Sequence, residues 1–268
     1  MSFLICPVCK GALIKNEHTY SCGAGHSFDI AKEGYVNLLM SQASSQKRHG
    51  DDKLMVRSRR DFLDKGYYSA LRDAVAEELA LNTAPGAHII DVGCGEGYYT
   101  ELLEAVNNPV AVGIDISKDA LKLASKRLKN TALCVASAFT LPCADSSADA
   151  VVNIFAPCAY GEFSRVLKPD GVLIKAVPLE DHLWELKCAL YGEPYKNKPE
   201  LRDDSLFELI SFKELKYTVD LPCSEDIFAL FTMTPYYYKT SASDSEKLLS
   251  RTSLSTTVHF GVEVYKKR

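Results

Sequence analysis

The chain has 268 residues, a formal net charge of −4 and an apolar fraction of 47%. These values are typical of a water-soluble globular protein with one large or two smaller domains, and they exclude a chain that is basic all over. No apolar run reaches the roughly 18 residues that span a bilayer, and no secretory signal pattern opens the chain, so we expect a cytoplasmic protein without a membrane partner.

The first 35 residues hold a compact set of candidate metal ligands. Cys6 and Cys9 form a C-x-x-C pair, and Cys22 with His26 supplies a second pair. Two such pairs suit tetrahedral zinc, which would hold together a stretch too poor in large apolar residues to fold alone. We therefore predict a zinc-binding module over residues 1–35. Four protein ligands close the coordination shell, so we expect the zinc to be structural.

Two other interpretations of these cysteines are a redox pair and a coincidence. A redox C-x-x-C normally lies at a helix N-terminus beside a βαβ pattern, which this stretch lacks. The chain has nine cysteines in all, an odd number, and most of them lie singly in apolar stretches. That distribution favours free thiols in a reducing compartment over a disulfide scaffold.

Residues 36–75 read as a linker, a polar loop followed by a helix over 53–71. Between residues 47 and 72 there are eight lysines and arginines against four acidic residues. In an acidic protein this cluster is the best candidate for contact with RNA phosphates, although a solvated helix face is nearly as good an interpretation. The candidate RNA contacts here are Lys47, Arg48, Arg57, Arg59 and Arg60.

From residue 76 to residue 268, short β-branched runs alternate with amphipathic helical runs. This alternation is typical of an α/β domain with a parallel sheet and crossover helices. We expect strands over 88–92, 110–114, 131–135, 150–154, 172–177 and 256–265. Ser117 is a plausible N-cap for a helix over 118–129.

The loop after the first of these strands indicates the cofactor. Residues 91–97 read D-V-G-C-G-E-G, with Gly93, Gly95 and Gly97 between a strand and a helix. Glycines there let the backbone turn tightly and let a ligand lie against bare main chain. A dinucleotide site would have a further glycine at position 98, which is a tyrosine here. The loop therefore favours S-adenosylmethionine, which carries no phosphate.

Acidic residues around the loop support that interpretation. Asp91 and Glu96 suit a sulfonium and an ammonium group better than a diphosphate. Asp115 follows the second strand, about 20 residues past the loop, where a carboxylate can accept both ribose hydroxyls. A glycine-rich turn alone is often only a turn, but here it lies between strand and helix with the distal acid in place.

The rest of this domain resembles the class I methyltransferases. The resemblance lies in residues 141–149 before the fourth strand and in residues 162–171, E-F-S-R-V-L-K-P-D-G, before the fifth. It implies a Rossmann-like fold, with Ala136 and Ser137 flanking the adenine. We also assign Asn153, in the fourth strand, to the cofactor site. Asp170 replaces the usual glycine of the second segment, a mild change because aspartate also forms turns.

The chain closely resembles the RlmA family of 23S rRNA guanine-N1 methyltransferases. The resemblance lies in the order of a zinc module, the run K-E-G-Y-V-N-L-L at 32–39 and a class I domain. Further matching segments are 28–35, 59–64, 91–100, 155–158, 182–187 and 233–235, while the last thirty residues match least well. The resemblance implies methylation of one guanine in a hairpin loop of 23S rRNA by a homodimer that forms the RNA cleft. It also implies that Tyr68 and His182 touch the cofactor; without it, we would interpret them as a core aromatic and a surface histidine.

Methyl transfer to guanine N1 depends mostly on alignment, because the sulfonium already activates the methyl group. The N1 proton must also leave, and no side chain stands out as its general base. Phe155, just after the fourth strand, could stack on the guanine or could be a core residue. Two other functions stay open: methylation of a small metabolite, which leaves the zinc module unexplained, and RNA binding without catalysis, which the intact cofactor loop argues against.

Overall fold

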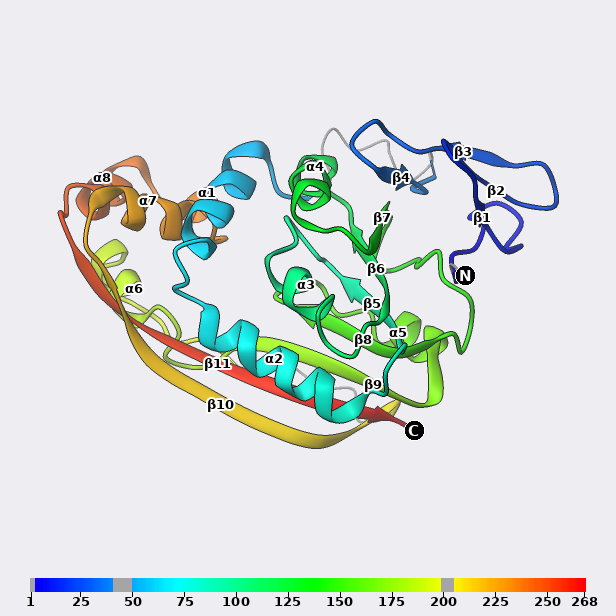
Figure 1. The fold of residues 1–268 in the computed structure, drawn as a ribbon. Helices are drawn as coiled ribbons and strands as arrows, with labels where there is room; N and C mark the ends of the chain where they lie inside the picture. The colour runs from blue at the N-terminus through cyan, green and yellow to red at the C-terminus, as the bar shows by residue number, and fades with distance from the viewer. Residues whose placement is uncertain (1–2, 41–49, 199–204) are drawn as a thin grey trace.

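The computed structural model describes residues 3–40, 50–198 and 205–268. An eight-stranded mixed sheet with helices on both faces forms most of the molecule, and a small three-stranded sheet lies at the N-terminal end (Figure 1). The predicted Rossmann-like α/β fold with an N-terminal module is thereby confirmed. Among the described residues, no helix combines the length and the apolar character needed to cross a membrane.

The order of the strands in the large sheet places the carboxyl ends of the parallel strands around one crevice. From one edge to the other the strands are β10 (Phe207–Leu221), β11 (Leu254–Lys267), β9 (Leu167–Pro178), β8 (Ala148–Ile154), β5 (His88–Val92), β6 (Val110–Asp115), β7 (Thr131–Val135) and β4 (Tyr35–Asn37). Pairs from β4 to β9 are parallel, whereas β11 is antiparallel to both β9 and β10. The chain leaves β5 toward β6 and later returns to its other side as β8, and such a switch point opens a ligand crevice.

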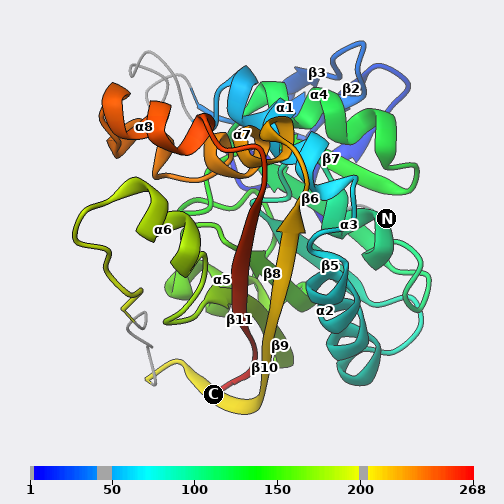
Figure 2. The ribbon, with the colours of Figure 1, turned by 90° about the vertical axis from the view of Figure 1, so that its left-hand side faces the viewer.

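All six predicted strands are present in the large sheet, and two further strands of that sheet were missed, as were the three short strands of the N-terminal sheet. β4 has only three residues, too few for a periodic pattern. β10 alternates partly buried and exposed residues along most of its length, but its pairing with β11 shifts register between Leu209 and Ser211. That irregularity and its position at the sheet edge weaken the period-two signal. Figure 2 shows how β10 and β11 run side by side along the molecule.

The helices lie on both sides of this sheet. They are α1 (Lys53–Leu63), α2 (Ser69–Asn82), α3 (Tyr98–Leu103), α4 (Lys118–Arg127), α5 (Tyr160–Val166), α6 (Trp184–Leu190), α7 (Ser224–Thr232) and α8 (Ala242–Leu249), with a 3₁₀ turn at Tyr237–Lys239. Ser117 caps α4 as predicted, its Oγ accepting a hydrogen bond from the N–H of Ala120 at 3.3 Å.

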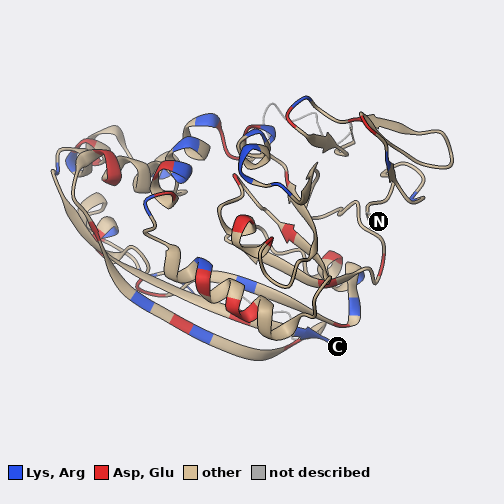
Figure 3. Ribbon diagram, viewed as in Figure 1, with Lys and Arg blue, Asp and Glu red and all other residues tan. Residues whose placement is uncertain are grey.

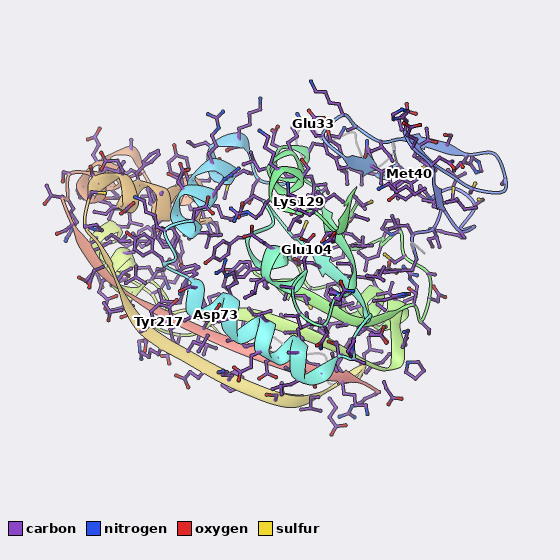
Figure 4. The ribbon with its side chains drawn as sticks, viewed as in Figure 1. Glu33, Met40, Asp73, Glu104, Lys129 and Tyr217 are labelled. Carbon is purple, nitrogen blue, oxygen red and sulfur yellow. The ribbon has the colours of Figure 1, made fainter. Side chains whose placement is uncertain are left out.

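The single helix expected over 53–71 is in fact two helices. Gly66 has φ of +78°, a left-handed conformation that interrupts a right-handed helix, and α2 starts shortly after it. The expected boundary at residue 75 therefore falls inside α2. Tyr217 of β10 reaches this connection and donates a hydrogen bond to the backbone oxygen of Tyr67 at 3.0 Å (Figure 4).

The N-terminal module packs directly on the large domain. Its strands are β1 (Ile14–Lys15), β2 (Thr19–Ser21) and β3 (Ser27–Asp29). Leu4 forms an antiparallel bridge with Cys143, and the N–H of Ile5 donates to the oxygen of Pro142 at 2.9 Å. Leu4 and Tyr20 belong to the same apolar core as the central strands. The module thus shares the core of the larger domain, and the expected boundary at residue 35 falls inside β4, which extends the large sheet.

Candidate active site and metal centre

A cavity of about 1390 Å³ opens at the carboxyl ends of the central strands. It brings together most of the residues that we assigned to the cofactor: Tyr68, Gly93, Gly95, Glu96, Asp115, Ala136, Ser137 and His182. Of the predicted RNA contacts, Arg59 and Phe155 also line it. Asp91, Gly97 and Asn153 are absent from the lining, as are Arg57 and Arg60. Lys47 and Arg48 lie outside the described residues.

The glycine loop has the shape that the predicted cofactor requires. Gly93, Gly95 and Gly97 all have positive φ, at +82°, +57° and +90°. A Cβ on Gly93 would come within 2.3 Å of the Ala156 side chain, so the loop packs tightly there. A Cβ on Gly95 would meet nothing within 4 Å and would project into open space. Because Gly95 lines the cavity, this bare stretch of backbone is a cradle for a ligand.

The Asp115 carboxylate holds this loop. Its Oδ2 accepts a hydrogen bond from the N–H of Gly95 at 2.9 Å, and its Oδ1 accepts one from Ser117 at 2.7 Å. Burial raises the pKa of Asp115, against the effect of these hydrogen bonds. Each carboxylate oxygen keeps a second lone pair, which a ligand hydroxyl can use.

Asp91 and Asn153 lie beneath the loop rather than in the cavity. Asp91 is buried and accepts a hydrogen bond from Thr100 Oγ1 at 2.6 Å, which ties β5 to α3. Burial raises its pKa to about 7. Asn153 Nδ2 donates to the backbone oxygen of Val92 at 3.3 Å. Both side chains therefore support the backbone on which the glycines lie.

Glu96 is oriented by an arginine that sequence reasoning missed. Arg127 Nη2 lies 2.9 Å from Glu96 Oε2, and the same guanidinium pairs with Asp64 and Glu101. Burial raises the pKa of Glu96, and Arg127 counteracts that effect. The ion pairs connect the loop to α1, α3 and α4, so Arg127 helps to fix the position of a carboxylate that lines the cavity.

Tyr68 and His182 are both buried at the cavity. The ring of Tyr68 packs edge-on against Phe62 and Phe260, and its hydroxyl has no hydrogen-bond partner among the described residues. His182 Nδ1 accepts from the N–H of His259 at 3.4 Å, and burial lowers its pKa to about 3. An uncharged imidazole next to a cavity suits a cationic ligand better than an imidazolium would.

The far side of the cavity was almost invisible in the sequence. Phe155 follows β8 with φ of +54°, an uncommon conformation for an aromatic residue, and its side chain is 45% exposed. Lys175 and Tyr238 also line the cavity, as do the segments 195–198 and 233–236. In the sequence, the tyrosine and lysines of the polar stretch 192–198 were the one feature that could have indicated a binding role for this segment.

The predicted basic segment divides into two groups. Arg59 faces the cavity, pairs with Asp51 and donates to the backbone oxygen of Met233 at 3.3 Å. Arg60 pairs with Asp64 at 3.4 Å. Arg57 is exposed and lines a separate groove between α1 and α4.

That groove is basic. Its charged lining consists of Lys53, Arg57, Lys122 and Lys126 against the single acid Asp119. Asp119 lies 3.7 Å from Lys122. Figure 3 shows lysines and arginines along both helices.

The four predicted metal ligands converge at the N-terminal module. The ligand atoms of Cys6, Cys9, Cys22 and His26 lie within 4.8 Å of one another. Each pair lies at a tight turn, with the N–H of Lys10 donating to Cys6 O at 2.9 Å in the first turn. Burial raises the pKa of the Cys22 thiol, but hydrogen bonds from His26 outweigh that effect and lower it to about 6. Soft sulfur and nitrogen donors at these separations fit tetrahedral zinc.

Known proteins match both parts of the chain. Residues 4–47 match the RlmA N-terminal zinc-ribbon family, and residues 83–220 match a methyltransferase-domain family. A 23S rRNA (guanine(748)-N(1))-methyltransferase of Streptomyces fradiae is 35% identical over 70% of this chain and 68% of its own length. YxjB of Bacillus subtilis, named for the same class of reaction, is 36% identical over 72% of this chain and 70% of its own.

This chain belongs to the RlmA methyltransferase family. It is therefore an enzyme that uses S-adenosylmethionine, and its N-terminal ribbon carries zinc. Among solved structures, the YcgJ protein of Bacillus subtilis aligns with a TM-score of 0.50 at 14% identity, covering 73% of this chain and 98% of that one. That likeness concerns the fold alone.

The residues that line the cavity fit the family cofactor, independently of the comparisons with known proteins. The bare backbone at Gly95, the acceptor lone pairs of Asp115 and the buried hydroxyl of Tyr68, which has no partner among the described residues, all belong to its lining. Bound S-adenosylmethionine would supply an electrophilic methyl group to an acceptor in the same cavity.

Proposed function

We propose that this RlmA family member methylates N1 of a single guanine in a hairpin loop of 23S rRNA. One observation carries the proposal: a single cavity of about 1390 Å³ is lined both by the residues that we assign to the cofactor and by the exposed ring of Phe155. Such a cavity can receive a flipped base next to the cofactor. The names of the two relatives, each of which aligns over about 70% of this chain, support the same reaction.

We assign the cofactor end as follows. The backbone at Gly93 and Gly95 receives the methionine part, and the Asp115 carboxylate accepts the ribose hydroxyls. Ala136 and Ser137 flank the adenine. Tyr68 and the uncharged His182 lie next to the sulfonium. Asp91, Gly97 and Asn153 act indirectly by holding the loop.

The acceptor end orients the base. Phe155 projects into the cavity from the end of β8, with its ring 5.1 Å from that of Phe260. Stacking on Phe155 would hold the guanine plane in one orientation, and alignment of nitrogen, methyl carbon and sulfur supplies much of the rate. Loss of the N1 proton to solvent leaves an anion shared between N1 and O6, and the cations that line the cavity would stabilise it before N1 accepts the methyl group.

The RNA backbone has a suitable surface next to the cavity. Met55 and Arg59 of α1 line the cavity, and Val56 and Arg57 of the same helix line the basic groove against α4. Three of its four cations, Lys53, Arg57 and Lys126, are exposed. Phosphates bound in this groove would therefore be separated from a base in the cavity only by α1. The zinc module is a further candidate for RNA contact.

We also propose a cytoplasmic homodimer whose two copies form the RNA cleft, as the family resemblance implies. Within each copy we keep residues 1–35 as the zinc module, residues 36–75 as a linker with basic residues and residues 76–268 as the catalytic domain. Sedimentation of the purified protein tests the dimer.

A direct assay tests the reaction. Purified enzyme with labelled S-adenosylmethionine is incubated with 23S rRNA from a strain that lacks the enzyme. We expect label in the rRNA and arrest of primer extension at one guanosine, because N1-methylguanine cannot pair. Failure to label rRNA together with labelling of a small molecule in a metabolite extract would replace the proposal with the metabolite alternative.

A further inference from the structure

Exposed aromatic side chains gather around one cavity. Among the described residues, the exposed phenylalanines and tyrosines are Phe139, Phe155, Tyr195, Phe212 and Tyr238. All except Phe212 line the cavity. Such clustering of large apolar rings at a concave site indicates a ligand with flat faces.

Tyr195 differs from the other three in how its ring is held. It stacks on Tyr191 with a centroid separation of 5.9 Å and an interplanar angle of 27°. Lys187 Nζ lies 5.2 Å from the Tyr195 centroid, and the Lys187 side chain is fully buried. The ring is therefore packed against an aromatic side chain and a cation, while 51% of the residue remains exposed.

The segment that carries Tyr195 is anchored to the catalytic domain. Lys187 Nζ donates to Asn197 Oδ1 at 2.7 Å, and Asn197 Nδ2 donates to the backbone oxygen of Leu179 at 2.9 Å. Lys196 pairs with Glu180 and Asp181 at 3.1 and 3.0 Å. These contacts attach the segment that carries Tyr195 to residues 179–181, which immediately precede His182. A platform fixed in this way loses little conformational freedom when a ligand binds.

The charge around this end of the cavity indicates an anionic ligand. Lys198 and Lys239 are exposed and line the cavity, as do Arg59, Lys175 and Lys196. Among the described residues of the lining, Asp51 is the only acid apart from Glu96 of the cofactor loop and Asp115. Flat rings together with cations are the combination that binds single-stranded nucleic acid.

We propose that Tyr195 is a stacking platform for an unpaired RNA base beside the target guanine. The proposal rests on the proposed function and adds a second base-binding position to the one at Phe155. Tyr191 and Lys187 hold the ring, its exposed part is available to the base, and Lys198 lies three residues away to receive a phosphate. Stacking needs the aromatic ring but not the hydroxyl, so Tyr195→Phe should preserve it.

The test compares Tyr195→Ala, Tyr195→Phe and the wild-type enzyme. The probe is a hairpin fragment of 23S rRNA with its loop bases replaced one at a time by 2-aminopurine. We expect Tyr195→Ala to bind the RNA about tenfold or more weakly and to lose the fluorescence quenching at one loop position. Tyr195→Phe should retain both, and the affinity for S-adenosylmethionine should be unchanged in all three proteins.

Phe212→Ala is the matched control, since it removes an exposed ring that does not line the cavity. Equal RNA affinity of Tyr195→Ala and wild type, or equal losses in Tyr195→Ala and Phe212→Ala, would overturn the platform. The binding measurement requires no methylation, so it is independent of the rRNA labelling assay. Thermal unfolding of each variant checks folding, and Tyr195→Leu serves as a second ring-deleting variant.

Discussion

Asp115 Oδ2 accepts a hydrogen bond from the backbone N–H of Gly95 at 2.9 Å, so the acid at the end of β6 fixes the glycine loop at the end of β5. These two residues are 20 positions apart in the chain and come together because β5 and β6 pair in parallel. The carboxylate thus has two tasks: it holds the loop and presents lone pairs to the cavity.

Asp115→Asn should weaken S-adenosylmethionine binding about 10- to 100-fold, because a charged acceptor is worth roughly 1.5–3 kcal/mol. Calorimetric titration measures the affinity. Asp119→Asn, on α4 and away from the cavity, is the control and should bind normally. Unchanged affinity in Asp115→Asn would show that the ribose contact lies elsewhere.

Gly95→Ala should abolish cofactor binding while the protein stays folded. The new methyl group would meet no protein atom within 4 Å and would occupy the cradle itself. Gly66→Ala is a matched control, because Gly66 also has positive φ (+78°) and open space but lies outside the cavity lining. Both variants should lose about 1 kcal/mol of stability from backbone strain, and only Gly95→Ala should lose binding in the titration.

Cys9→Ser should remove the zinc, which we expect at about one ion per chain by metal analysis. Since the module shares a core with the catalytic domain, loss of the metal should also lower the melting temperature of the whole protein. Cys188→Ser, at an exposed thiol of α6, should keep the metal. Full zinc content in Cys9→Ser would contradict the assigned ligand set.

His182 should make stability pH-dependent. Its pKa is lowered to about 3 by burial, so below about pH 6.5 the unfolded chain takes up a proton that the native imidazole does not. This contribution to stability is present above pH 6.5 and is lost as the pH falls toward 3. Relative to His182→Asn, the wild type should lose about 2 kcal/mol of unfolding free energy between pH 7 and pH 5. Urea unfolding at both pH values measures it, and parallel changes in the two proteins would refute the assignment.

The double variant Arg57→Gln/Lys126→Gln should bind 23S rRNA fragments more weakly, with a salt dependence of log affinity that is less steep by about 1 to 2. Lys213→Gln/Lys216→Gln removes the same charge from β10, on a part of the sheet remote from the groove, and should behave like wild type. An unchanged salt slope in the first variant would exclude the groove from phosphate binding.

Short-range patterns were sufficient for much of this protein. The glycine loop, the acid after the second strand and the two ligand pairs, Cys6–Cys9 and Cys22–His26, could be identified because each depends on local backbone geometry or on residue spacing. The six strands followed from β-branched runs. The resemblance to the RlmA family supplied the substrate, which no spacing could indicate.

Only the tertiary structure decided the acceptor side of the cavity. Tyr195 acquires its support from Lys187 and Tyr191, and Arg57 meets Lys122 and Lys126 because α1 packs against α4. Arg57 and Lys126 lie on helices that are distant in the chain, whereas Tyr195 follows Lys187 and Tyr191 by eight and four residues, and neither group carries a pattern that predicts the contact. The cofactor end was predictable because local geometry builds it, whereas the RNA end depends on which surfaces the fold brings together.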